Sequence, residues 1–145
     1  MPDNDAMVTE DEIIDLIKVK TGTEKINSDS DIFNDLGVVG DDFDELLGEY
    51  HKKFDVNMDK YLWYFHADEE GQSIGGLFFK SPNKRVTRIP VTPKMLTEFA
   101  NVKKWDIQYP EHKLPKYRLD IIINQTLIAG LVIWLLTQLV KSYFS

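Results

Sequence analysis

A single uncharged run near the C-terminus constrains this chain more than any other feature of its sequence. Residues 121–140 contain 14 apolar residues, five uncharged polar ones and Gly130. Twenty helical residues extend about 30 Å, which matches the hydrocarbon thickness of a bilayer. The polar residues lie within six positions of the ends of the run, whereas a helix lying flat on a membrane carries them along one whole face. We therefore predict a transmembrane helix over residues 119–141, with these residues in the membrane: Ile121, Leu127, Gly130, Trp134 and Val140.

Positive charge before this run predicts how the helix is oriented. Lys113, Lys116 and Arg118 precede it, whereas only Lys141 follows it. Because basic residues that flank a span stay on the cytoplasmic side, we expect a single-pass protein of the cytoplasmic (inner) membrane with its N-terminal domain in the cytoplasm. The acidic N-terminus has no apolar run of the kind found in signal peptides. This favours a tail-anchored protein in which residues 142–145 are a short tail.

Charge divides the chain into two unlike parts. Residues 1–50 hold 15 Asp or Glu and 3 Lys or Arg, whereas residues 51–145 hold 9 and 14. The acidic part repels phosphate backbones, so we expect no nucleic-acid partner. The basic surplus between Lys80 and Arg118 suits anionic lipid headgroups, which contribute about 1 kcal/mol per well-placed charge. The cytoplasmic membrane is therefore one expected partner.

Capping signals predict a first helix followed by a long loop. Thr9 and Glu12 form a capping-box pair in front of apolar residues at helical spacing, which predicts a helix over residues 9–20. The polar, turn-rich residues 22–35 then form a loop. We expect three apolar residues to anchor this loop to the core: Ile26, Ile32 and Phe33.

A second helix is predicted over residues 42–53. Its apolar positions recur at spacings of three and four. Asp42 can cap the amides of the first turn, and Glu45 stands at the reciprocal position. Asp41 and Asp44 add negative charge where the helix dipole favours it.

A small β-hairpin and a further helix are predicted in the rest of the domain. Residues 76–80 (GLFFK) and 85–91 (RVTRIPV) are typical of two strands joined by SPNK, and the proline in the second places it at an edge. Thr92 and Pro93 suit the N-cap and first position of a helix that continues to about Trp105.

These elements together resemble acyl and peptidyl carrier proteins. The shared pattern is a helix, a long loop ending in IFNDLG, and a helix opened by an acidic cluster. Within that superfamily the chain is similar to an uncharacterised bacterial acyl-carrier-like family of unknown function, through DLGVVGDDFDELL, KKFDV, the aromatic stretch after it and RIPVTPKMLTEFANVKKW. The resemblance covers residues 8–107. It implies a mainly α, acyl-carrier-like helical bundle, which we place over residues 1–108 with the β-hairpin as an insertion. The tail lies outside the resemblance: its prolines and basic residues predict a linker over residues 109–118, ahead of the transmembrane helix.

One departure from the carrier pattern decides what the resemblance implies. Carriers attach phosphopantetheine to a serine at the start of the second helix, and Asp42 stands in that place here. Serine and threonine are absent between Ser30 and Ser73, and a carboxylate cannot form that stable phosphodiester. We therefore expect no cofactor. The resemblance implies instead that the acidic helix binds a protein partner with a basic surface, through Asp41, Asp42, Asp44, Glu45 and Glu49.

The sequence indicates no catalytic or metal site. The chain has no cysteine, and His51, His66 and His112 lack the paired spacing of a zinc site. Within residues 27–38, Asn27, Asp29 and Asp31 occupy alternate positions like the first three ligands of a calcium-binding loop. The stretch lacks the glycine and the bidentate glutamate that such a loop requires. A nucleophile elbow and a phosphate-binding glycine loop are also missing. We expect a protein that is not an enzyme and binds no metal.

The aromatic run at Tyr61, Trp63, Tyr64 and Phe65 has two interpretations. Aromatic density of this kind favours core packing, and a groove for an acyl chain or a partner's apolar segment is the alternative.

The function expected from these features is that of a membrane-anchored, non-catalytic, carrier-like adaptor or regulator. Two alternatives stay open. One is an acyl carrier in lipid or acyl metabolism with a noncanonical attachment site. The other is a structural membrane subunit that oligomerises through its span, where Thr126 and Gly130 offer a face of small residues.

Overall fold

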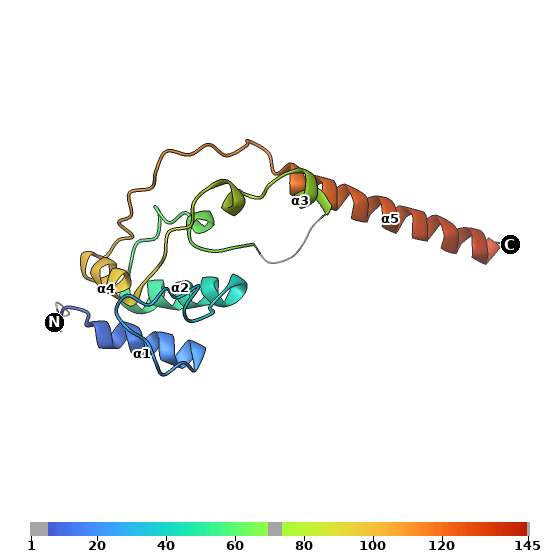
Figure 1. Ribbon diagram of the computed structural model, residues 1–145. Helices are drawn as coiled ribbons and strands as arrows, with labels where there is room; N and C mark the ends of the chain where they lie inside the picture. The colour runs from blue at the N-terminus through green and yellow to red at the C-terminus, as the bar shows by residue number, and fades with distance from the viewer. Residues whose placement is uncertain (1–5, 70–73, 145) are drawn as a thin grey trace.

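The computed structural model of the chain describes residues 6–69 and 74–144. Figure 1 shows a helical domain from which one long helix, α5 (Leu119–Phe144), projects. The prediction of a mainly helical chain is confirmed, and the described residues include no β-strand. The other elements are these: α1 (Glu10–Thr21), α2 (Gly40–Phe54), the 3-10 helix η1 (Trp63–Phe65), α3 (Ile74–Phe78), the 3-10 helix η2 (Pro82–Arg85) and α4 (Pro93–Val102).

Local capping explains where α1 begins and ends. The Thr9 hydroxyl accepts a hydrogen bond from the Glu12 amide (3.4 Å), and the Glu12 carboxylate accepts one from the Thr9 amide (2.8 Å). Gly22 ends the helix in the left-handed conformation, with φ of 67°. The predicted capping box is confirmed. The predicted N-cap of α4 is confirmed as well, because the Thr92 hydroxyl accepts a hydrogen bond from the Met95 amide (3.3 Å).

Helices α1, α2 and α4 share one apolar core. Ile17, Phe43 and Leu96, one from each helix, are all 0% exposed. The long loop between α1 and α2 enters this core through Ile32, whose amide donates to the Val91 carbonyl (3.0 Å). Full burial of such a side chain contributes about 1.5–3 kcal/mol. The expectation of a loop held by apolar anchors is confirmed.

Helix α2 begins before the residue that the sequence predicts. Its N-cap is Val39, which is extended and offers no side-chain hydrogen bond, so Asp42 lies inside the first turn. The prediction that Asp42 caps this helix is wrong. Gly37 and Gly40 adopt positive φ values of 68° and 54°, a conformation that glycine takes without steric cost. These two glycines let the chain turn into the helix ahead of the acidic cluster.

A capping residue at position 39 should therefore stabilise the domain. The Val39 side chain is 41% exposed, so a polar replacement needs no repacking. We expect Val39→Asp to raise the free energy of unfolding by about 1 kcal/mol in a urea titration, the usual contribution of an N-cap. Asp42→Asn is the matched control and should change it by less than about 0.5 kcal/mol, as surface substitutions do. A loss of about 1 kcal/mol in the control would show that Asp42 caps the helix in solution.

The predicted β-hairpin is absent from the described part of the chain. Its first half lies in α3 and the turn after it, and SPNK contributes to η2. Residues 86–91 carry no helix or strand, and their backbone bonds elsewhere. The Ile89 amide donates to the Phe65 carbonyl (2.6 Å), and the Val91 carbonyl accepts from Ile32. The hairpin prediction is wrong because η1 and the α1–α2 loop occupy the hydrogen-bonding groups that a second strand would need.

Candidate functional site

The five predicted partner-binding acids all lie on α2, and we call them the acidic face: Asp41, Asp42, Asp44, Glu45 and Glu49. All except the half-buried Glu49 are exposed. The opposite side of α2 buries Phe43, Leu46 and Leu47 in the core. Helical periodicity therefore turns the carboxylates outward, on an element held rigidly by its apolar side.

A basic side chain from α1 neutralises part of the acidic face. The Lys20 ammonium lies 2.8 Å from a Glu45 carboxylate oxygen and 2.5 Å from one of Glu49. Hydrogen bonds to Glu45 and then Glu49 raise the pKa of Lys20, and the bond to Lys20 lowers the pKa of Glu45. Sequence reasoning missed Lys20, because a pair 25 residues apart on two helices leaves no periodic signal.

The other three acids have no such partner. Asp41, Asp42 and Asp44 form no hydrogen bond or ion pair with the rest of the described chain. Partial burial, followed by repulsion from Asp41, raises the pKa of Asp44. The acidic face thus combines an occupied half near Lys20 with a half that is open to an external cation.

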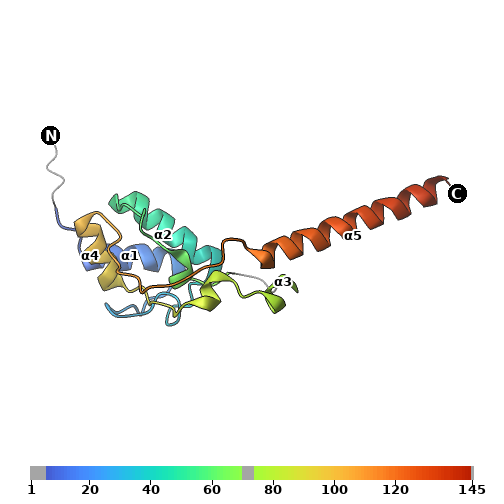
Figure 2. The ribbon, with the colours of Figure 1, turned by 90° about the horizontal axis from the view of Figure 1, so that it is seen from above.

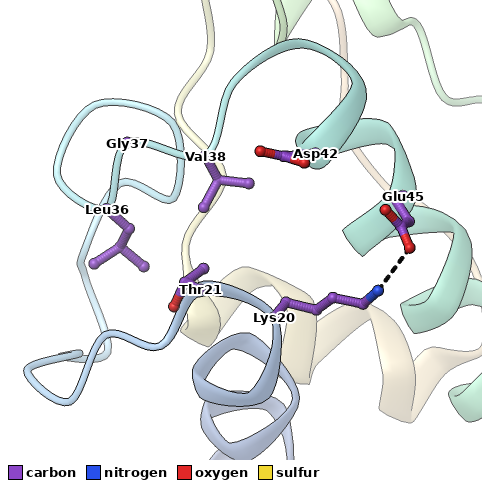
Figure 3. Close-up of a pocket in the computed structure, with 7 residues that line it drawn as sticks. All are labelled: Lys20, Thr21, Leu36, Gly37, Val38, Asp42 and Glu45. Atoms are coloured by element: carbon purple, nitrogen blue, oxygen red, sulfur yellow. Dashed lines mark hydrogen bonds and ion pairs between the residues drawn. The ribbon is translucent and has the colours of Figure 1, made fainter.

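A hollow of about 270 Å³ lies at the amino end of α2, beside this open half (Figure 3). Asp42 and Glu45 stand on its α2 side, and Figure 3 shows the Lys20 side chain crossing toward Glu45. Gly37 and Val38 from the preceding loop supply the opposite wall. The full lining is Lys20, Thr21, Leu36, Gly37, Val38, Asp42 and Glu45. Glu45 is already paired with Lys20, so Asp42 is the carboxylate at this hollow that remains for a lysine or arginine side chain of a partner.

A buried polar network centred on His66 lies next to the aromatic run. His66 is 0% exposed. Its Nδ1–H donates to the Ile89 carbonyl (2.9 Å), and its Nε2 accepts from the Tyr109 hydroxyl (2.8 Å). The same hydroxyl accepts from the Trp105 indole (2.8 Å). Burial lowers the pKa of His66 to about 4, so the imidazole is neutral at pH 7. Since both ring nitrogens are engaged internally, the role of His66 is structural.

Core packing is the interpretation that holds for two residues of the aromatic run. Phe65 is 0% exposed, and the Tyr61 ring lies edge-on to Trp105 with centroids 5.0 Å apart. Tyr109, in the segment predicted as a linker, packs on Phe65 with centroids 4.8 Å apart. The start of that segment is therefore attached to the domain.

Within residues 6–69 and 74–144, no group of three or more His, Cys, Asp or Glu side chains is arranged to hold a metal ion. Asp31, from the calcium-like stretch, instead pairs with Arg88 and accepts from the Phe33 amide (3.1 Å). This carboxylate ties the α1–α2 loop to the segment before α4.

A family model described as a protein of unknown function (DUF1493) matches residues 6–108. The chain belongs to this family. Neither a curated protein nor a solved structure matches it. The DUF1493 region holds α1 to α4 and the whole acidic face, whereas α5 lies beyond it. The prediction of an uncharacterised family is confirmed, and the likeness to acyl carriers stays a prediction.

Beyond the DUF1493 region, α5 is long and apolar enough to cross a membrane. Its 26 residues extend about 39 Å, more than the hydrocarbon layer requires. The predicted membrane residues Ile121, Leu127, Trp134 and Val140 are exposed, and a Cβ on Gly130 would meet nothing within 4 Å. An exposed apolar surface of this size needs lipid or protein to cover it. This supports membrane association, while the inner membrane and the orientation stay predictions.

Proposed function

We propose that the protein is a membrane-anchored, non-catalytic adaptor or regulator, similar to a carrier domain, whose acidic face binds a basic surface on a protein partner. Helix α5 anchors it in the cytoplasmic membrane of a bacterium, with the DUF1493 region on the cytoplasmic side. The observation that carries the proposal is the group of three exposed carboxylates on the first turns of α2, Asp41, Asp42 and Asp44, which lack a counter-charge in the described part of the chain.

Lys20 supplies an internal example of how a cation binds this face. One ammonium bridges two carboxylates a helical turn apart, at 2.8 and 2.5 Å. A partner's lysine or arginine can bridge Asp41 and Asp44 in the same way, because they are separated by three positions on the same helix. Repulsion from Asp41 contributes to the raised pKa of Asp44, and a cation placed between them would relieve that repulsion.

Neutralising the open half of the acidic face should abolish capture of the partner. We expect the full-length variant Asp41→Asn, Asp42→Asn, Asp44→Asn to recover the partner from solubilised membranes at about one tenth of the wild-type amount or less, a loss of about 1.4 kcal/mol or more. Quantitative mass spectrometry of the captured proteins measures this. Wild-type capture should also decrease with added salt, because exposed charge pairs are screened.

A control with the same change in net charge separates the site from the overall charge. Asp11, Asp15 and Asp29 are exposed acids on α1 and the following loop, and their replacement by Asn should leave capture unchanged. If both triple variants recover the same proteins in the same amounts as the wild type, the acidic face is not the binding surface.

A structural subunit that oligomerises through α5 is the second candidate. It is favoured by the open space around Gly130 and by Thr126, whose hydroxyl donates to the Ile122 carbonyl (2.8 Å) within the same helix. Both residues thereby leave a small, apolar surface on which a second helix can pack. Recovery of a second tagged copy as the main captured protein, equally by the wild type and both triple variants, would support this candidate over the adaptor.

A further inference from the structure

Helix α3 exposes three apolar side chains that the packing of the domain does not use. Ile74, Leu77 and Phe78 are 58%, 81% and 73% exposed. They stand next to one another on a helix of five residues. Large apolar side chains gathered in this way mark a surface that something else covers.

The position of α3 beside α5 indicates what covers it. Figure 2 shows α3 next to the first turns of α5. The Gly75 amide donates to the Asn124 side-chain oxygen (2.9 Å). A Cβ at position 75 would lie 2.0 Å from the Asp120 carbonyl oxygen, so glycine is what allows the two helices to approach this closely. The apolar side chains of α3 are therefore held at the level where the apolar run of α5 begins.

Arg118 strengthens this junction from the other side. Its guanidinium donates to both Glu69 carboxylate oxygens (2.8 and 2.7 Å) and to both of Asp120 (3.0 and 2.6 Å). The Arg118 guanidinium thus links Glu69, which precedes α3, to Asp120 in the first turn of α5.

Basic residues follow the exposed apolar group along the chain, whereas the exposed Asp68 and Glu69 precede it. Residues 74–88 contain four Lys or Arg and no Asp or Glu. Arg88 is paired with Asp31, whereas Lys80, Lys84 and Arg85 are exposed. Apolar side chains flanked by basic ones are the composition of segments that lie in the interface of anionic membranes.

We infer that α3 is a second membrane contact, with Leu77 and Phe78 inserted between headgroups and acyl chains, and with Lys80, Lys84 and Arg85 on anionic headgroups. This inference rests on the proposed membrane anchoring by α5. Two contacts with one bilayer restrict the orientation of the domain relative to the membrane. A single helix joined through a linker would allow many orientations. The acidic face would then be presented in a defined direction.

Single-cysteine labelling tests this directly, because the native chain contains no cysteine. A nitroxide is attached to Phe78→Cys, Val19→Cys or Leu131→Cys of the full-length protein, reconstituted in vesicles of phosphatidylglycerol and phosphatidylcholine. Val19 is the matched control, since it is an apolar residue 83% exposed on α1. Leu131 reports whether the middle of α5 lies in hydrocarbon. Electron paramagnetic resonance gives the accessibility of each label to oxygen and to a water-soluble nickel complex.

The inference predicts a raised ratio of oxygen to nickel accessibility at position 78, a higher ratio at 131 and an aqueous value at 19. In vesicles of phosphatidylcholine alone, the label at 78 should shift toward the aqueous value. An aqueous label at 78 together with a buried label at 131 overturns the inference and leaves the α5 anchor intact. An aqueous label at 131 overturns the anchor itself. Equal depth at 78 in both kinds of vesicle contradicts the role given to the three basic residues.

Discussion

Replacing Leu131 and Leu135 by lysine should release the protein from the membrane. Both residues lie in the central part of α5 and are more than half exposed, at 56% and 52%. A lysine at the centre of a span costs about 3 kcal/mol for insertion, so two cost about 6 kcal/mol and leave the helix uninserted. We expect the double variant in the soluble fraction after an alkaline carbonate wash, and the wild type in the pellet.

The matched control places the same two charges near the end of α5. Leu139→Lys with Ser142→Lys adds the same charge where long side chains reach interfacial water, so this variant should stay in the membrane. Retention of the central double variant after the wash would show that α5 does not anchor the protein by spanning.

Mild acid should destabilise the domain through His66. Burial holds the pKa of its neutral imidazole at about 4, compared with 6.5 in an unfolded chain, and the positive charge of Arg88 adds to this effect. Between these two values the unfolded state binds a proton that the folded state does not, so stability is lost as the pH falls. A difference of 2.5 pKa units corresponds to about 3 kcal/mol, lost between about pH 6.5 and pH 4. Urea unfolding of the full-length protein in mild detergent, followed by near-UV circular dichroism, measures this dependence.

One variant assigns the acid response to His66. His66→Gln cannot gain a proton in this range, so its stability should change less with pH than that of the wild type, even though it starts lower because of the disturbed bonds to Ile89 and Tyr109. A wild-type slope in His66→Gln would mean that another group causes the acid response.

The predicted elements that the structure confirms depend on neighbours in the chain. Thr9 and Glu12 are three residues apart, and Thr92 caps Met95 at the same separation. Their hydrogen bonds form within one helical turn and need no distant partner. The long apolar helix α5 was likewise predictable, because a run of uncharged apolar residues of this length has few other stable states.

The predictions that failed concern residues with competing distant partners. Asp42 has the right side chain for a cap, but Gly37 and Gly40 turn the chain so that α2 begins before it. RVTRIPV has strand propensity, but Ile89 and Val91 bond to η1 and to the α1–α2 loop. Propensity was outweighed in both segments by contacts formed only after the chain folds.

The amino-acid sequence by itself determined the N-caps of α1 and α4, that Ile32 anchors the α1–α2 loop, that one segment is apolar and long enough to cross a membrane, and that negative charge gathers on α2. Only the tertiary structure decided that Lys20 occupies half of the acidic face, that Tyr109 bonds to His66, and that Gly75 places α3 against α5. These contacts join residues 25, 43 and 49 positions apart. Capping and periodicity act over a few residues, whereas such contacts depend on which surfaces meet when the whole chain collapses, and no short stretch of sequence contains that information.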